Sequence, residues 1–167
     1  MTNYDAIDFS PLAALGGDDE VVTHSLVRDV TLPSGRVLAL ITLDNGRDHT
    51  RPNTFGPGTL TELDGVLEAL TARAAAGEIH AVGLTGKQYI LAAGADLSDV
   101  SRVPSRAVAK LVAQQGHFVL GKLGALGVPS FAFVNGLALG GGLEIALHST
   151  YRTVDASAAA IALPEVF

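Results

Sequence analysis

The 167-residue chain contains no cysteine and no tryptophan, and only 17% of its residues are charged. Without cysteine it has no disulfide, thiolate nucleophile or cysteine metal ligand, which suits a reducing compartment, and we expect a cytoplasmic location. Lysine and arginine number 11 against 17 aspartates and glutamates, so the net charge is -6. Nucleic acids and anionic membrane surfaces bind concentrated positive charge, so neither is expected as a partner. The first residues, MTNYDAIDFS, lack the basic and apolar regions of a secretory signal.

One uncharged run of 21 residues, 123–143, is long enough to cross a bilayer. A spanning helix would have to include Pro129, Asn135 and six glycines, and each glycine costs a helix interior ~1 kcal/mol relative to alanine. The run also lacks the usual flanking anchors of a membrane span. We therefore expect a buried strand, a glycine turn and the start of a helix here, and no membrane span.

Strand-like and helix-like patterns alternate along the rest of the chain. Two β-rich runs, separated by Pro33-Ser34-Gly35, predict an antiparallel hairpin. Leucines at helical spacing predict a helix that ends at Gly77, and residues 59–62 have the spacing of a capping box. Further strands are expected at 80–85, 89–93, 130–134 and 151–154, and further helices at 106–126 and 140–148. This alternation predicts an α/β fold over residues 21–167, after an N-terminal extension at 1–20.

Several familiar catalytic motifs are missing from the sequence. It has no G-x-G-x-x-G, no P-loop and no G-x-S-x-G elbow, so the motifs typical of nucleotide phosphate binding and of serine hydrolases are absent. The five histidines never fall at metal-ligand spacing, so no metal site is expected. His80 and His117 are interpreted as surface or helix residues.

A glycine triplet and two glutamates in apolar surroundings are the candidate catalytic features of the sequence. Residues 140–142 are glycines at the predicted start of a helix, where backbone N–H groups lack acceptors. Such amides can form an oxyanion hole, or the glycines can simply permit tight helix packing. Glu144 lies in the first helical turn, where a carboxylate is also favourable for purely structural reasons. Glu165 follows Pro164 among apolar neighbours, and two such acids suit general acid and base catalysis.

Three segments, in this order along the chain, resemble the crotonase (enoyl-CoA hydratase/isomerase) superfamily. Residues 92–97, AAGADL, are similar to its A-G-A-D segment. Residues 134–144, VNGLALGGGLE, resemble its V-N-G-x-A-x-G-G-G-x-E segment, and residues 163–166, LPEV, resemble its P-E segment. The resemblance covers roughly residues 21–167 and implies a partial crotonase domain, a ββα spiral whose C-terminal part is missing from this chain.

The resemblance also implies roles for individual residues. The backbone N–H groups of Ala95 and Gly141 would form the oxyanion hole for an acyl-CoA thioester carbonyl. Glu144 would activate water for attack on C3, and Glu165 would supply the proton at C2. The implied reaction is the reversible hydration of a trans-2-enoyl-CoA in fatty-acid β-oxidation, with no cofactor in this chain. Contacts with the CoA substrate are implied at Arg51, Pro52, Asn53, Ala93, Gly94, Asp96 and Gly140.

Among crotonases, the chain looks most like the N-terminal hydratase part of an actinobacterial fatty-oxidation multifunctional α-subunit. In such proteins a 3-hydroxyacyl-CoA dehydrogenase that uses NAD follows, so NAD would belong to a part missing from this sequence. A homo-oligomer, or association with a thiolase β-subunit, is the expected assembly. Two other functions stay open: a Δ3,Δ2-enoyl-CoA isomerase that relies on one glutamate, and a non-catalytic fragment that binds acyl-CoA or associates with full-length subunits.

Overall fold

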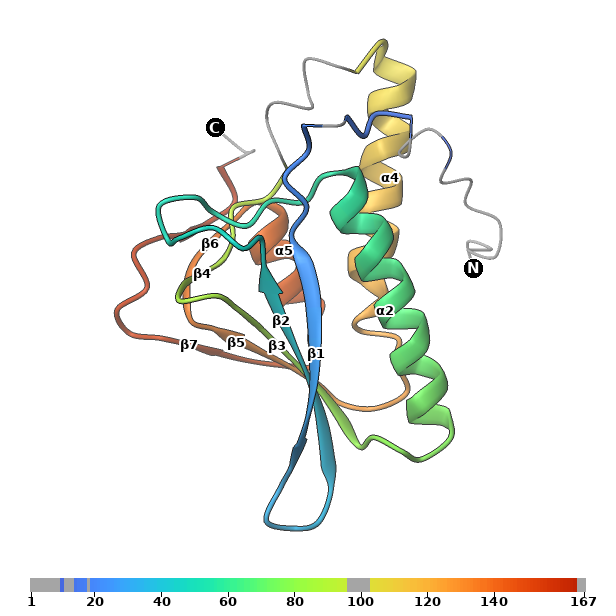
Figure 1. Ribbon diagram of the computed structural model, residues 1–167, viewed down its shortest axis with the longest axis vertical. Coiled ribbons are helices and arrows are strands. Elements are labelled where there is room, and N and C mark those ends of the chain that lie inside the picture. Colours follow the sequence, from blue (N-terminus) through green and yellow to red (C-terminus); the bar gives the residue numbers. More distant parts are fainter. Residues whose placement is uncertain (1–9, 11–13, 18, 96–102, 165–167) are drawn as a thin grey trace.

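The computed structural model of the chain describes residues 10, 14–17, 19–95 and 103–164. Within these ranges strands and helices alternate, as predicted, and form two β-sheets with helices packed beside them (Figure 1). The elements are β1 (His24–Thr31), β2 (Val37–Asp44), α2 (Pro57–Ala75), β3 (Ala81–Gly86), β4 (Tyr89–Ala92), α4 (Arg106–Lys122), β5 (Ser130–Val134), β6 (Gly136–Leu139), α5 (Gly141–Leu147), β7 (Tyr151–Val154) and β8 (Ile161–Ala162). Most of the segment 1–20 lies outside the described residues, so the domain boundary after residue 20 stays a prediction.

The larger sheet has five strands in the order β1-β2-β3-β5-β7. β1 and β2 form the predicted antiparallel hairpin, in which His24 lies opposite Asp44 and Thr31 opposite Val37. β2, β3, β5 and β7 run parallel to one another. Parallel neighbours need crossover connections, and α2, α4 and α5 lie in those connections. Figure 1 shows α2 and α4 side by side along one side of the sheet.

The smaller sheet, in the order β4-β6-β8, reveals a repeating unit. β3, β4 and α4 follow one another as a strand of the larger sheet, a strand of the smaller sheet and a helix, and β5, β6 and α5 repeat that order. A single parallel bridge joins Phe55, just before α2, to Ala95, just after β4. The repeated strand–strand–helix order is the ββα arrangement that the sequence resemblance implied.

The predicted capping box at residues 59–62 is wrong. Helix α2 begins earlier, at Pro57, and its N-cap residue, Gly56, has no side chain; the Gly58 N–H in the first turn donates instead to Glu20 Oε1 at 2.8 Å. Thr59 and Glu62 therefore lie inside the helix and bind the chain at the start of β1. Thr59 Oγ1 accepts a hydrogen bond from the Thr23 N–H at 2.8 Å, and Glu62 Oε1 accepts one from a backbone N–H of β1 at 2.7 Å. The local spacing predicted that Thr59 and Glu62 cap the helix, but both side chains instead bind backbone N–H groups that are distant in the sequence.

The core lies between the larger sheet and the helices. The leucines whose spacing predicted α2 are all buried: Leu60, Leu63, Leu67 and Leu70. In α4, by contrast, only the C-terminal half is embedded, because Val119 and Leu120 are buried whereas Leu111 is 44% exposed. The helix therefore packs into the core mainly through its C-terminal half, and Figure 1 shows its first turns extending past α2.

The apolar run 123–143 is divided among the loop after α4, strands β5 and β6, and the start of α5. None of the helices in the described ranges is long and apolar enough to cross a membrane. β6 was not predicted, because only a glycine turn was expected between the buried strand and the next helix. The Asn135 side chain instead donates hydrogen bonds to the carbonyls of Gly86 (2.9 Å) and Lys87 (2.7 Å), which ties the β5–β6 junction to the β3–β4 turn.

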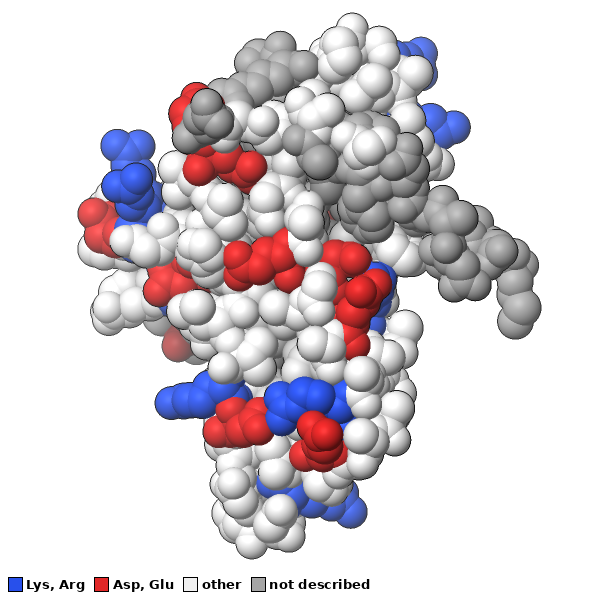
Figure 2. Space-filling model, turned by 45° about the vertical axis from the view of Figure 1, so that its right-hand side comes forward, with Lys and Arg blue, Asp and Glu red and all other residues white. Residues whose placement is uncertain are grey.

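Charged side chains are distributed in small groups. Figure 2 shows one face on which the Lys and Arg side chains form separate groups, with Asp and Glu side chains between and beside them. Local ion pairs join some of these charges, since Arg73 lies 2.7 Å from Asp29 and 3.3 Å from Glu78. This distribution agrees with the small share of basic residues in the sequence.

Candidate active site

Three loop segments meet at the carboxyl ends of β4 and β6, which are parallel neighbours. The loop before α2 is held to the end of β4 by two backbone hydrogen bonds. The Phe55 N–H donates to the Gly94 carbonyl at 2.8 Å, and the Ala93 N–H donates to the Asn53 carbonyl at 2.8 Å. The third segment is the glycine triplet that follows β6 and opens α5. These segments contain most of the site residues that the resemblance implied.

The second and third segments touch through their glycines. Gly94 has a φ of 86°, which favours glycine, and a Cβ atom there would lie only 3.1 Å from the Gly141 nitrogen. A Cβ atom at Gly142 would overlap the backbone carbonyl of Ala92 at the end of β4. The first turn of α5 can therefore approach β4 this closely only because side chains are absent at these positions.

Two backbone amides at this contact are free among the described residues. The N–H groups of Ala95 and Gly141 donate no hydrogen bond there, whereas the Gly140 N–H donates to the Ala162 carbonyl at 3.0 Å. Gly141 is the first residue of α5, where N–H groups have no acceptor within the helix. Ala95 is exposed and Gly141 is half-buried, so both amides are open to a ligand. Free amides at such a contact can bind a carbonyl oxygen that gains negative charge.

Glu144 lies beside these amides, in the first turn of α5 as predicted. Its Oε2 atom lies 3.8 Å from the position that a Cβ atom would take on Gly141. The carboxylate and Gly141 share a cavity of about 270 Å³ with Ala95. The remaining wall of this cavity consists mainly of apolar and small residues: Phe55, Leu60, Val112, Ala113, Gly116, His117 and Leu120. An acid and free amides thus face a space bounded largely by apolar surface.

Helix α4 contributes a wall to this cavity that the sequence pattern did not predict. Val112, Gly116 and Leu120 recur at intervals of four, so they lie on one helical face, and His117 lies next to Gly116 on it. His117 is an exposed helix residue, as predicted, but its place in the cavity was not foreseen. Its ring centroid lies 5.4 Å from that of His148, at the end of α5. Burial lowers the pKa of His148, and so does His117, whereas Glu144 raises it.

A second cavity, of about 560 Å³, lies along the loop after β2. It is lined by Val21, Asn45, Arg47, Asp48, Arg51, Pro52 and Thr54. Two of the implied CoA contacts, Arg51 and Pro52, therefore line a cavity, and Arg51 is exposed. Lys87, which the sequence analysis did not single out, holds this loop: its Nζ donates to the carbonyls of Arg47 (2.9 Å) and Arg51 (2.7 Å) and to Asn45 Oδ1. Burial lowers the pKa of Lys87.

Asn53, the third implied CoA contact of this loop, lies inside the protein, and its contact with CoA stays a prediction. Asn53 has no exposed surface, and its side chain is fully engaged with the backbone. Its Oδ1 accepts a hydrogen bond from the Asn45 N–H, and its Nδ2 donates to the carbonyls of Leu43 and Leu91. The side chain therefore links the loop to the ends of β2 and β4, and it has no open face for a ligand.

Comparisons with known proteins agree with this architecture. The sequence profile of the "Enoyl-CoA hydratase/isomerase" family matches residues 35–166. The chain belongs to the enoyl-CoA hydratase/isomerase family. Among curated proteins, it is 33% identical over 132 residues to the fatty acid oxidation complex subunit alpha of Shewanella frigidimarina, a match that covers 77% of this chain and 18% of that protein. The same subunit of Shewanella amazonensis is 32% identical over 130 residues, again with 77% and 18% covered.

Solved structures of the enoyl-CoA hydratase/isomerase family share the fold. An enoyl-CoA hydratase from Bacillus anthracis superposes with a TM-score of 0.65 at 25% identity, covering 79% of this chain and 48% of that one. Pseudomonas aeruginosa DspI gives a TM-score of 0.65 at 28% identity, covering 86% and 54%. A putative enoyl-CoA hydratase from Rhodopseudomonas palustris gives 0.63 at 26% identity, covering 82% and 50%. These likenesses confirm the predicted crotonase-like fold.

This member of the enoyl-CoA hydratase/isomerase family spans about half the length of those solved structures and about a fifth of the curated relatives. The structure brings together Ala95, Gly141 and Glu144, with Gly94 and Gly140 as their immediate supports. Asp96 and Glu165 lie outside the described residues, so their positions and roles stay predictions.

Proposed function

We propose that this site belongs to an enoyl-CoA hydratase that adds water reversibly to trans-2-enoyl-CoA in fatty-acid β-oxidation. One observation carries the proposal: the free amides of Ala95 and Gly141 lie beside the Glu144 carboxylate in a largely apolar cavity. Hydration of an enoyl thioester needs donors for the carbonyl oxygen and a base for the water, and these groups supply both. Family membership and the names of the curated relatives support the same reaction.

In the proposed mechanism, the two amides bind the thioester oxygen of the substrate. Glu144 takes a proton from a water molecule, whose oxygen then bonds to C3. The C2–C3 π electrons move toward the thioester, so that negative charge develops on the oxygen held by the amides. Because these donors belong to the backbone and are fixed before the reaction, they stabilise that charge without rearrangement. The apolar walls around the site favour an uncharged acyl chain.

The reaction is completed by a proton at C2 of the enolate, and we assign its delivery to Glu165, as the resemblance implied. Water and this acid–base pair supply every atom that the reaction adds, so the proposed chemistry needs no cofactor or metal in this chain. The CoA part of the substrate is assigned to the cavity beside Arg51 and Pro52, where Arg47 adds positive charge suited to phosphate groups. Ala93, Gly94, Asp96 and Gly140 are assigned to the substrate contact through the backbone around the oxyanion hole.

The proposed assembly is multi-subunit. The curated relatives are named as subunits of a fatty acid oxidation complex, which supports association with other subunits. A homo-oligomer or a thiolase β-subunit is the partner that we propose, and the cytoplasm is the proposed location, because the cysteine-free sequence suits a reducing compartment.

The proposal is tested with crotonyl-CoA. The purified chain should add water to it, as followed by mass spectrometry, and Glu144→Gln should lower the rate by roughly 10²–10⁴-fold. Glu78→Gln is the matched control, because Glu78 is a carboxylate that pairs with Arg73 at the far end of α2. Circular dichroism checks that both variants fold. Undiminished turnover in Glu144→Gln would contradict the proposed base.

A binding measurement covers the case in which the isolated chain turns over slowly. Crotonyl-CoA should shift the backbone amide NMR signals of Ala95 and Gly141 more than those of β1, which lies away from the cavity. A chain that neither hydrates crotonyl-CoA nor shows these shifts would refute the proposal.

Replacing the second acid, Glu165, distinguishes a hydratase from an isomerase. A hydratase that uses both glutamates should lose most activity in Glu165→Gln, because the proton at C2 loses its source. An isomerase that relies on Glu144 alone should retain much of its activity in the same variant. Measuring hydration of crotonyl-CoA and isomerisation of a 3-enoyl-CoA side by side distinguishes the two.

A further inference from the structure

Helices α4 and α5 meet at a contact that is built around His148. Two glycines, Gly121 in α4 and Gly124 just after it, leave space for His148. A Cβ atom at Gly121 would lie 3.8 Å from His148 Cε1, and one at Gly124 would lie 2.9 Å from the His148 carbonyl oxygen. His148 is the residue that ends α5, and its backbone N–H donates to the Glu144 carbonyl at 3.1 Å. The His148 imidazole therefore packs against α4, and His148 lies one helical turn after Glu144, the proposed base.

The second imidazole comes from α4 itself. His117 lies one turn before Gly121, and its ring meets that of His148 edge-to-face, with centroids 5.4 Å apart and planes at 63°. His117 also lines the same cavity as Glu144. Neither imidazole forms a hydrogen bond with another described residue, so their ring nitrogens are free to exchange protons there. Glu144, His148 and His117 thus form a chain of titratable groups from the cavity across the helix contact.

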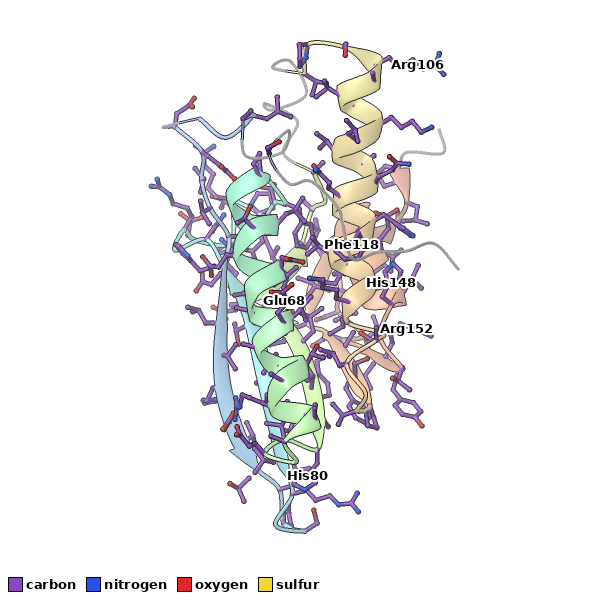
Figure 3. All side chains as sticks on the ribbon, turned by 90° about the vertical axis from the view of Figure 1, so that its right-hand side faces the viewer. Glu68, His80, Arg106, Phe118, His148 and Arg152 are labelled. Carbon is purple, nitrogen blue, oxygen red and sulfur yellow. The ribbon has the colours of Figure 1, made fainter. Side chains whose placement is uncertain are left out.

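The other charges near this contact are engaged elsewhere. Lys122, one turn after Phe118 on α4, lies 2.6 Å from Asp64 and 2.9 Å from Glu68 of α2. Arg152 of β7 donates to the carbonyls at the end of α5, at 2.7 Å and 3.1 Å. Figure 3 shows His148 and Arg152 near the C-terminal half of α4, with Glu68 on α2 on the other side of that helix. Lys122 is therefore paired with acids of α2, and Arg152 keeps a constant charge, so among the described side chains at this contact the two imidazoles are the groups that can change charge near neutral pH.

We propose that His117 and His148 are positioning residues for Glu144, which together take up one proton on acidification and thereby place a positive charge beside the carboxylate. Two imidazolium rings at this separation repel each other, and His117 accordingly lowers the pKa of His148. While the pair is neutral, it places no positive charge beside Glu144. Once the pair is protonated, its positive charge opposes the approach of the proton that Glu144 must take from water. Its effect on catalysis depends on the proposed function, whereas the proton coupling is a property of the three residues themselves.

The test is an NMR titration of the His148 ring in the full 167-residue chain. The coupling predicts opposite shifts in two variants that change neighbouring groups. In His117→Gln the pKa of His148 should rise, because a repelling neighbour is removed. In Glu144→Gln it should fall, because an attracting carboxylate is removed. Both substitutions are close in size to the original residues and lie at exposed positions, so the fold should persist.

His80→Gln is the matched control, because His80 is an exposed histidine near one end of the molecule, whereas His148 lies near its middle (Figure 3). It should leave the titration of His148 unchanged. If the pKa of His148 stays the same in both test variants, or moves in the same direction in both, the proposal is wrong. This result would leave the hydratase assignment intact, because the titration involves no turnover.

The kinetic consequence is a separate readout. For the wild-type chain, kcat/KM for crotonyl-CoA should fall between pH 7.5 and 5.5, as the imidazole pair gains its proton. The double variant His117→Gln/His148→Gln should show a weaker dependence, because the two imidazoles that lie closest to Glu144 among the described histidines are then gone. The same pH profile in the wild-type chain and in the double variant would refute a role for the pair in catalysis.

Discussion

Replacing Asn53 by alanine should destabilise the protein by about 3 kcal/mol. The Asn53 side chain has no exposed surface and makes three hydrogen bonds to backbone groups: the Asn45 N–H at 3.1 Å, the Leu43 carbonyl at 2.8 Å and the Leu91 carbonyl at 3.0 Å. The Leu43 carbonyl keeps the Lys87 N–H as a partner at 2.9 Å, but the other two backbone groups lose theirs in a buried place, and each such loss costs about 1–3 kcal/mol. For a chain of this length, 3 kcal/mol corresponds to a fall in Tm of about 6–12 °C.

Urea and thermal unfolding, followed by circular dichroism, measure this change directly. Gln88→Ala is the matched control, since it removes an exposed side-chain amide, and it should change the free energy of unfolding by less than about 0.5 kcal/mol. The reasoning is refuted if Asn53→Ala costs less than about 1 kcal/mol. A normal stability combined with a strongly raised KM for crotonyl-CoA would instead support Asn53 as a CoA contact.

Three further predictions rest on single contacts. Gly142→Ala should lower the free energy of unfolding by about 2 kcal/mol, because its Cβ atom overlaps the Ala92 carbonyl, and urea unfolding measures this loss. Lys87→Met should speed amide hydrogen exchange in residues 45–51, because the three acceptors that the Lys87 ammonium holds there are released. Stability should fall as the pH drops below 6.5, because the pKa of His148 is lower in the folded than in the unfolded chain, so the unfolded chain binds the proton first. Urea unfolding between pH 7.5 and 5.5 should show a smaller fall for His148→Gln than for the wild-type chain.

Much of the fold was predictable because local patterns and tertiary packing agree. The leucine spacing of α2 and the hairpin of β1 and β2 both specify a face that the core then buries. Prediction failed where a distant partner decides the outcome. Glu62 was assigned to a helix cap, but its carboxylate instead accepts a hydrogen bond from a backbone N–H of β1. Leu111 follows the apolar pattern of α4, yet nothing among the described residues covers that part of the helix.

The candidate site was predictable to a similar degree, and for a similar reason. The motif residues Gly94, Gly141 and Glu144 do lie together, because their segments follow neighbouring strands of one sheet. His117 was not found, since a single histidine on a helix carries no local sign of the cavity that it faces. The burial of Asn53 was not predicted, because burial of a polar side chain becomes visible only when its partners from β2 and β4 are in place.

The amides of Ala95 and Gly141 have a consequence for how this protein tolerates mutation. Every residue except proline keeps its backbone N–H, so almost no single substitution deletes these donors chemically. The two candidate donors are therefore set by the path of the main chain, and a substitution removes them mainly by displacing that path. Under the proposed function, apolar side chains of the cavity wall, such as Val112 and Leu120, can change the fit to an acyl chain without deleting either donor. A Cβ atom at Gly94 or Gly142, by contrast, would displace the path that carries both donors.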